Sequence, residues 1–352
     1  MKKAEAILVP CAAIAAAMLV FGIFCAALGV NPFAVYGSIY RAAFGSWYSW
    51  QNTLVRASPL LLTGLCTAIP ARAGIIVIGN EGAVVMGGIG AIAAGLATLS
   101  WAPWLSLAMM IAAAMLCGGA WIASSVALQH YRGVSAVISG LLLSYIAIAA
   151  MDQIIEGPMR DPSSFNSPAT FPLTPDHRLG FFSGTHVHYG LIFGLIACVA
   201  AWFLIERTTF GFAMKIAGGN VRAARLAGLP VGRLVVAAGF LGGAAAGIAG
   251  MVEVAAVHGR GNESLNAGYG YTGILVAFLA RQNPALVILV ALFVGGLSAS
   301  GGMLQRAHDL PDATIAVLQG ILFLFILLSD TAWERLRARA ERAGAKSVAA
   351  TV

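Results

Sequence analysis

Charged residues are scarce in this 352-residue chain, and their scarcity excludes most classes of protein. Asp, Glu, Lys and Arg together make up 10% of the residues, whereas soluble globular domains have about 25%. So few charges cannot cover a water-exposed surface, which excludes soluble enzymes and disordered chains. Because 59% of the residues are hydrophobic, the sequence predicts an all-α integral membrane protein.

Cysteine pairs and catalytic motifs are also missing. The five cysteines stand singly within apolar runs, without CxxC spacing, and are interpreted as reduced packing residues. No Gly-x-Ser-x-Gly, no His-Glu-x-x-His and no paired Asp within the apolar runs supplies a nucleophile, a zinc site or a carboxylate pair. We therefore expect no catalytic residue, metal or cofactor, and an intramembrane enzyme is the least supported hypothesis.

A phosphate-binding loop of the type G-x-x-x-x-G-K-[ST] is absent as well. The nearest string, Gly344-Ala345-Lys346-Ser347, lacks both glycines at the required spacing. If ATP drives this protein, we expect another chain to hydrolyse it.

Apolar runs that approach the roughly 20 helical residues needed to cross a bilayer are abundant. The first, residues 6–30, is too long for a signal peptide and is interpreted as a span. Two runs are imperfect: 57–71 lies between two arginines, and 271–280 is either a span that starts near Leu265 or a half-helix. We predict ten spans, at residues 6–30, 57–71, 83–100, 104–128, 134–151, 189–205, 234–252, 271–280, 285–303 and 313–329.

The basic residues test this count, because cytoplasmic loops are enriched in Lys and Arg. With ten spans and both termini in the cytoplasm, 15 of the 21 basic residues lie inside. The net charge of +7 is then an orientation signal, with anionic lipid headgroups rather than nucleic acid as its neighbours. The six basic residues outside are Arg41, Arg56, Arg160, Arg178, Arg260 and Arg306.

The ten spans form one predicted membrane domain over residues 1–352, with three polar segments. Spans two to five and seven to ten have opposite orientations, an arrangement typical of transporters that is visible here only in hydropathy. Residues 152–188 form an external loop rich in proline, either a docking surface or a connector; its histidines, without a cysteine, do not indicate a metal site. Residues 206–233 form the longest internal loop, and residues 331–352 a basic cytoplasmic tail.

The internal loop contains a predicted short helix at residues 221–227. Asn220 is a suitable N-cap, Gly228 can adopt the left-handed conformation that ends a helix, and Pro230 prevents continuation. Arg222 and Arg225 share one face of this helix. Each arginine alone could be a cytoplasmic anchor, but a complete small helix between two spans indicates a protein partner.

This loop resembles the cytoplasmic loop of permease subunits of bacterial ABC importers of the simple-sugar and nucleoside branch. Gly79-Asn80-Glu81-Gly82-Ala83 is similar to the family's Asn-x-Gly-x-Glu-Gly-Gln segment, with Ala83 in place of Gln. Gly268-Tyr269-Gly270 matches its Gly-Tyr-Gly motif, and residues 156–162 resemble the outer loop of nucleoside-type members, which work with basic membrane lipoproteins. The resemblance covers roughly residues 50–330.

The resemblance implies a ten-helix permease of the vitamin-importer type, in the bacterial inner membrane, for a nucleoside or a simple sugar. It implies that two copies or two homologous chains form the pore, with a second, different permease chain favoured. It also implies separate ATPase subunits inside and a substrate-binding lipoprotein outside. The helix at 221–227, with Asn220, Arg222, Ala224, Arg225 and Gly228, would then receive movement from the ATPase.

Ionisable side chains at membrane depth are costly and therefore candidates for function. Glu81 either faces a water-filled pathway or caps the N-terminus of the third span, where the helix dipole favours a carboxylate. Glu253, at the outer end of the seventh span, either belongs to the pathway or marks the boundary between lipid and water. Asn80 and Tyr271 join them, because amides and phenols bind sugar hydroxyls and the edges of bases.

Two further expectations concern packing and mechanism. Small residues recur at four-residue spacing from Gly242 to Gly250, which favours close helix packing within the subunit, or in part between subunits. An ion-coupled secondary transporter remains the alternative to an ABC permease, and it would need no ATPase.

Overall fold

The computed structural model describes residues 2–164 and 167–329, so the predicted basic tail at 331–352 lies outside the described residues. Within the described residues the chain is helical and forms no strand, as the composition predicts. The elements are α1 (Lys2–Ala27), α2 (Pro32–Phe44), α3 (Trp47–Ala71), α4 (Asn80–Ala97), α5 (Pro103–Arg132), α6 (Ala136–Glu156), η1 (Pro175–His177), α7 (Gly190–Arg207), α8 (Thr209–Gly219), α9 (Val221–Leu226), α10 (Val231–Val252), η2 (Glu253–His258), η3 (Glu263–Leu265), α11 (Tyr269–Leu279), α12 (Pro284–Ala299) and α13 (Gly301–His308), followed by an apolar helix at Ala313–Ser329.

Each of the ten predicted segments contains a helix, but not all of these helices are long enough to be full spans. Seven stretches of the described chain are long and apolar enough to cross a membrane, or eight if the bent pair Ala12–Ala27 and Pro32–Phe44, with 116° between its helices, is one span. The helix α11 has 11 residues and is therefore about 16 Å long, half of a bilayer core. The half-helix alternative is the one that the structure supports.

Local sequence signals explain where several helices begin. Ser46 and Thr208 act as N-caps of α3 and α8, each accepting a hydrogen bond from a backbone N–H three residues later. Pro103 begins α5, and Gly133 ends it in the left-handed conformation. The helix α2 was not predicted, although Asn31, which accepts a hydrogen bond from Phe33 N, supplies an N-terminal signal before Pro32.

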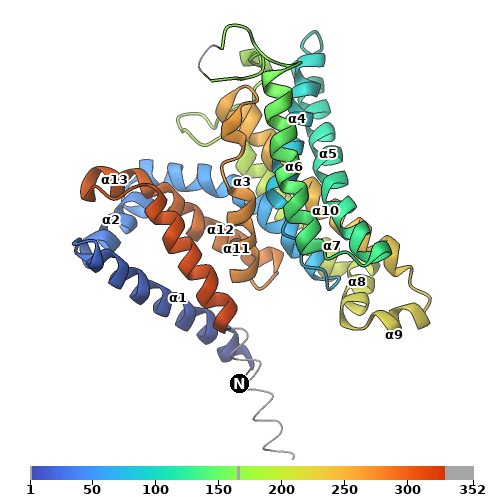
Figure 1. The fold of residues 1–352 in the computed structure, drawn as a ribbon, viewed down its shortest axis with the longest axis horizontal. Coiled ribbons are helices and arrows are strands. Elements are labelled where there is room, and N and C mark those ends of the chain that lie inside the picture. The colour runs from blue at the N-terminus through green and yellow to red at the C-terminus, as the bar shows by residue number, and fades with distance from the viewer. Residues whose placement is uncertain (1, 165–166, 330–352) are drawn as a thin grey trace, which may run out of the picture. The chain divides into compact units, whose positions relative to one another are not determined.

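The chain divides into two compact units. The first holds the described parts of Met1–Ala42 and Ser300–Val352, in which Ser38 Oγ lies 2.9 Å from His308 Nε2 and the Tyr36 hydroxyl donates to Met18 O. The second unit, Ala43–Ala299, carries all of the predicted site residues. In Figure 1 its long helices connect the loop after α6, at the top, with α8 and α9 at the bottom.

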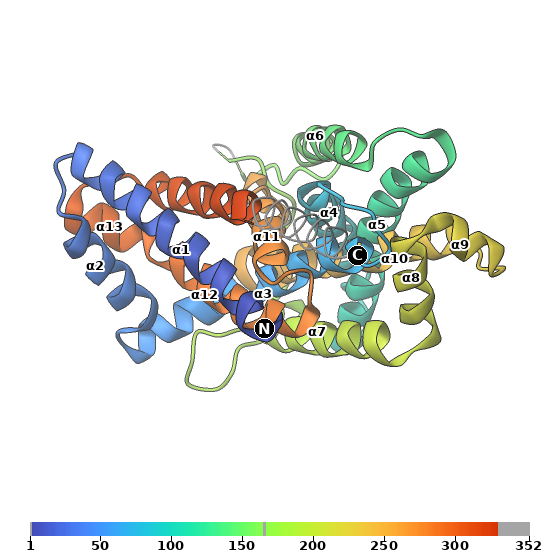
Figure 2. The ribbon, with the colours of Figure 1, turned by 90° about the horizontal axis from the view of Figure 1, so that it is seen from below.

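Within the second unit, α3 and α10 form the centre. The most apolar stretches of these helices are 78% and 72% buried, whereas that of α7 is 28% buried. Large apolar side chains of α5, α6 and α7, such as Leu116, Tyr145 and Phe203, are exposed, as expected for surfaces that face lipid. Figure 2 shows α3 and α10 between these outer helices.

Glycines bring α4, α5 and α10 into direct backbone contact. A Cβ atom at Gly247 would collide with the Ala114 carbonyl oxygen of α5, and one at Gly250 with the Val84 carbonyl oxygen of α4. A Cβ atom at Gly87 of α4 would meet Gly247 itself. The small-residue stripe of α10 therefore packs inside the subunit, in agreement with the first of its two interpretations.

Candidate functional site

Two helices of the second unit begin at internal breaks and meet at their N-termini. The segment at residues 72–79 is not helical and precedes α4, and the segment at 259–268, which contains only the short η3, precedes α11. A Cβ atom at Gly270 would collide with the backbone of Glu81, so the first turns of the two helices touch. Helix N-termini carry unpaired N–H groups and partial positive charge. Their contact therefore needs an acceptor between them.

Glu81 supplies that acceptor. Its Oε1 accepts a hydrogen bond from Gly268 N at 2.9 Å, and its Oε2 accepts one from Gly270 N at 2.6 Å. The side chain is fully buried. Glu81 lies in the first turn of its own helix α4, where the helix dipole favours a carboxylate, but both of these hydrogen bonds come from the start of α11. It caps the N-terminus of α11, which is 187 residues away in the chain.

Asn80 connects the same junction to α3 through two hydrogen bonds. Its Nδ2 donates to Thr63 O at 3.1 Å and to Thr67 Oγ1 at 2.9 Å. Its Oδ1 is buried and has no hydrogen-bond partner among the residues that the structure describes. Gly82 N donates to Ser144 Oγ of α6 at 3.2 Å. The first turn of α4 is thus fixed by two neighbouring helices, with one amide oxygen left to accept a hydrogen bond.

Glu253 is also buried. It is 3% exposed, in the π-helical turn η2 that continues α10 and packs against α4. Its Oε2 lies 3.7 Å from His258 Nε2. Tyr269 lies within electrostatic reach of both Glu253 and Glu81, and Arg56 Nη1 donates to its hydroxyl at 3.4 Å.

The structure therefore gathers three of the four predicted pathway residues around the start of α11, and places the fourth beside Tyr269. Tyr271, on the first turn of α11, is 39% exposed and is the most accessible of them. Sequence reasoning did not select Thr63, Thr67 or Tyr269. The two threonines lie four residues apart in an apolar helix, and this spacing could have indicated them. The role of Tyr269 depends on Arg56 of α3 and Glu253 of η2, which are distant in the sequence.

The predicted internal helix is present as α9, and it lies far from this junction in the chain's fold (Figure 1). Asn220 Oδ1 accepts from Ala223 N at 3.0 Å, and Gly228 has a φ of +76°, so both predicted ends are confirmed. Arg222 and Arg225 are exposed, and Ala224 is buried. Leu226 is 85% exposed, which leaves a large apolar side chain beside two cations.

The loop at residues 152–188 is attached to the rest of the second unit over its described residues. Leu173 N donates to Gly259 O at 2.8 Å, and Leu179 N donates to Ala255 O at 3.0 Å. His186 is exposed, whereas His188 is only 1% exposed. The loop is thereby attached to the segment that leads into α11.

Comparison with known proteins identifies the family to which this chain belongs. A family model described as the permease component of the branched-chain amino acid transport system matches residues 49–327. The chain belongs to this family of permeases. The matched region contains both the junction of α4 with α11 and the loop that carries α9.

Several named permease proteins are similar to this chain. It is 31% identical to the glucose ABC transporter permease protein TsgB13 of Haloferax volcanii, over 91% of this chain and 87% of that protein. It is 28% identical to the guanosine ABC transporter permease protein NupP of Bacillus subtilis, over 93% and 95%. It is 26% identical to the guanosine ABC transporter permease protein NupQ of the same organism, over 78% and 90%.

Proposed function

We propose that this permease is the pore subunit of an ABC importer that carries a nucleoside or a simple sugar. The observation that carries the proposal is the similarity over nine-tenths of the chain to permeases named for guanosine and glucose. Both solutes are neutral and rich in hydroxyl groups, so their recognition depends on hydrogen bonds.

The junction of α4 with α11 is the proposed substrate pathway, with Asn80, Glu81, Glu253 and Tyr271 as its residues. Asn80 Oδ1 and the Tyr271 hydroxyl are groups that can bind a sugar hydroxyl or a base N–H. Glu81 and Asn80 are buried in this conformation. Passage of a substrate therefore requires the first turns of α4 and α11 to separate, which would exchange the Glu81 hydrogen bonds for bonds to substrate or water.

The proposed ATPase contact is α9 together with α8. Leu226 offers an apolar side chain that can anchor the contact. Arg222 and Arg225 offer positive charge that can pair with acidic residues at the rim of the ATPase surface. The Asn220 cap and Gly228 keep the short helix rigid, so that a displacement by the ATPase reaches α7 and α10 on either side. The permease itself is proposed to be non-catalytic.

Two more partners follow from the loop and the relatives. The ordered external loop at 152–188 is the proposed docking surface for a substrate-binding lipoprotein, and its hydrogen bonds to Ala255 and Gly259 connect that surface with α11. A second, different permease chain is proposed for the pore, because Bacillus subtilis has two guanosine permease proteins, NupP and NupQ, that are both similar to this chain.

The proposed topology has ten membrane segments in the bacterial inner membrane, of which α11 is a half-helix, with both termini in the cytoplasm. It places α8 and α9 inside and the loop at 152–188 outside, at the opposite ends of the second unit that they occupy in Figure 1. The excess of basic residues on the proposed inner side supports this orientation.

Uptake by proteoliposomes tests the proposal. The complete transporter, with its ATPase and second permease, is reconstituted with or without ATP on the side of the ATPase, and labelled guanosine and glucose are supplied with the binding protein. We expect uptake of one of them only with ATP and with an ATPase able to hydrolyse it. Uptake driven by an ion gradient without the ATPase would instead support a secondary transporter.

A further inference from the structure

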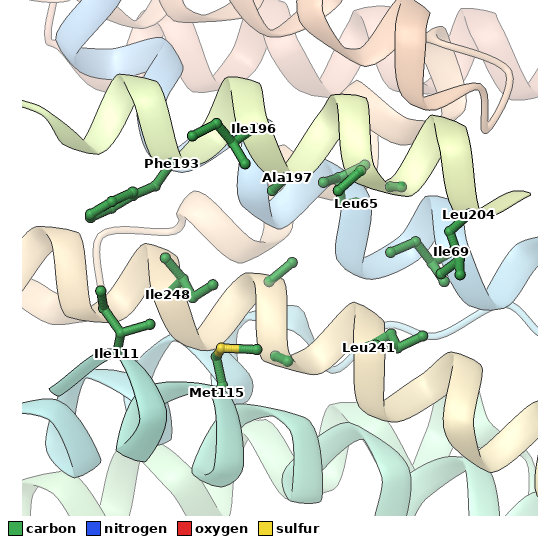
Figure 3. A pocket seen from close by; sticks show the side chains of 14 residues that line it. Leu65, Ile69, Ile111, Met115, Phe193, Ile196, Ala197, Leu204, Leu241 and Ile248 are labelled. Carbon is green, nitrogen blue, oxygen red and sulfur yellow. The ribbon is translucent and has the colours of Figure 1, made fainter. Parts of the chain in front are cut away.

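A groove of about 410 Å³ lies between α7 and a surface formed by α3, α5 and α10 (Figure 3). Every side chain that lines it is Ala, Ile, Leu, Met or Phe. It is distinct from the junction of α4 with α11. In Figure 3 one end is marked by Phe193 and Ile248, and the other by Leu204, Leu241 and Ile69.

The length of this groove matches one hydrocarbon chain. Phe193 and Leu204 are 11 residues apart on α7, or about 16 Å at 1.5 Å per residue, which is about one leaflet of a 30 Å bilayer core. One acyl chain of a leaflet can therefore lie along the groove from end to end.

Cations gather at one end of the groove. Arg207 and Arg72 follow Leu204 and Ile69 by three residues, or about one helical turn. Both lie, with Lys215, within electrostatic reach of Glu206, whose Oε2 is 2.7 Å from Lys215 Nζ. The Arg207 guanidinium lies over the Trp202 ring, 5.6 Å from its centroid. Three cations thus surround one carboxylate, which leaves net positive charge at the membrane surface.

We propose that this groove binds one acyl chain of an anionic phospholipid, with the headgroup at Arg72, Arg207 and Lys215. An apolar groove that opens toward the bilayer cannot hold ordered water, since it offers no hydrogen-bond partner. A lipid chain restores the dispersion contacts that the lining side chains would otherwise lack. Juxtamembrane cations attract anionic headgroups, which selects the lipid class.

Native mass spectrometry of the complete transporter in mild detergent tests this proposal. The probes are phosphatidylglycerol and phosphatidylcholine with identical acyl chains. We expect one phosphatidylglycerol per copy of this chain, bound more tightly than phosphatidylcholine. Replacing both Arg207 and Lys215 by Gln should lower the phosphatidylglycerol affinity about 30-fold, since each cation near the surface contributes about 1 kcal/mol.

A matched pair of variants tests the location. Ala200 lines the groove, so Ala200→Trp should fill it and abolish binding of phosphatidylglycerol. Its neighbour Val199 is 59% exposed and does not line the groove, so Val199→Trp should bind as the wild type does. Gel filtration verifies that both variants assemble, and the double Gln variant provides the test if Ala200→Trp does not.

Three results would overturn the proposal. The first is equal affinity for the two lipids in the wild type, and the second is unchanged binding of phosphatidylglycerol in assembled Ala200→Trp or in the double Gln variant. The third is a wild type that binds no lipid while Ala200→Trp separates the two permease chains, which would assign the groove to the interface between them.

Discussion

At the scale of single residues, Glu81 holds together a junction that would otherwise be repulsive. Two helix N-termini in contact bring together N–H groups and partial charges of the same sign. The Glu81 carboxylate belongs to one helix and accepts from Gly268 N and Gly270 N of the other. A negative charge that would be costly in the membrane is thereby placed where two helix ends favour it.

The first prediction concerns this carboxylate. In Glu81→Gln the side chain keeps its size, but its amide group would place a donor against a backbone donor. We expect a loss of about 1–3 kcal/mol in the free energy of unfolding, seen as a lower Tm in detergent. Glu263→Gln, at an exposed position of η3, is the matched control. An equal Tm for the two variants would contradict the role assigned to Glu81.

His188 gives the second prediction. Burial lowers its pKa to about 4, from an ordinary value of 6.5. Between these pH values the unfolded chain binds a proton that the folded protein does not, so stability falls as the pH is lowered from 6.5 toward 4. The loss approaches about 3 kcal/mol. We expect Tm, measured from pH 7 to pH 4.5, to fall less steeply in His188→Leu than in the wild type. Equal slopes of Tm against pH in the two proteins would refute this role of His188.

At the scale of elements, the contact of α4, α5 and α10 depends on the absence of side chains. A methyl group at Gly247 meets the Ala114 carbonyl oxygen of α5, and helix backbone has little freedom to move away. We expect Gly247→Ala to cost about 1–3 kcal/mol or more and to lower the yield of assembled transporter. Gly37→Ala, in α2 with open space around it, should be neutral or slightly stabilising. An unchanged Tm and yield for Gly247→Ala would show that the three helices are packed less closely.

The short helix α9 carries the fourth prediction. Leu226→Asp replaces the exposed apolar side chain proposed to anchor the ATPase, without disturbing any buried contact. We expect it to abolish co-purification of the ATPase while the permease keeps its wild-type Tm. Phe181→Asp changes a side chain that is 51% exposed in the loop at residues 152–188 and serves as the control. Retention of the ATPase by Leu226→Asp would move the proposed contact away from α9.

Elements with their own local signals were predictable from the sequence. The ten apolar segments all contain helices, and the capped α9 ends where Asn220 and Gly228 indicate. The junction was only half predictable. Asn80, Glu81 and Tyr271 stand out as polar residues at breaks in apolar runs, but no local pattern shows that Glu81 reaches a helix 187 residues later.

At the scale of the whole molecule, the loop at residues 152–188, the buried junction of α4 with α11 and the short helix α9 all belong to the second unit of the permease. The loop is hydrogen-bonded to the segment before α11, and α9 lies between the ends of α7 and α10. Movement at either surface can therefore reach the pathway through elements of the second unit. The central claim is that the solute passes where α4 and α11 meet.

ATP-driven uptake by the alanine variants of Asn80 and Glu81 tests that claim most directly. Each variant is reconstituted with its partners, and the assembly of the complex and its ATPase activity are measured in parallel with uptake. We predict that Asn80→Ala and Glu81→Ala lose most of their uptake, and that at least Asn80→Ala, which leaves the α11 cap in place, still assembles. Uptake and assembly equal to the wild type in both variants would contradict the account.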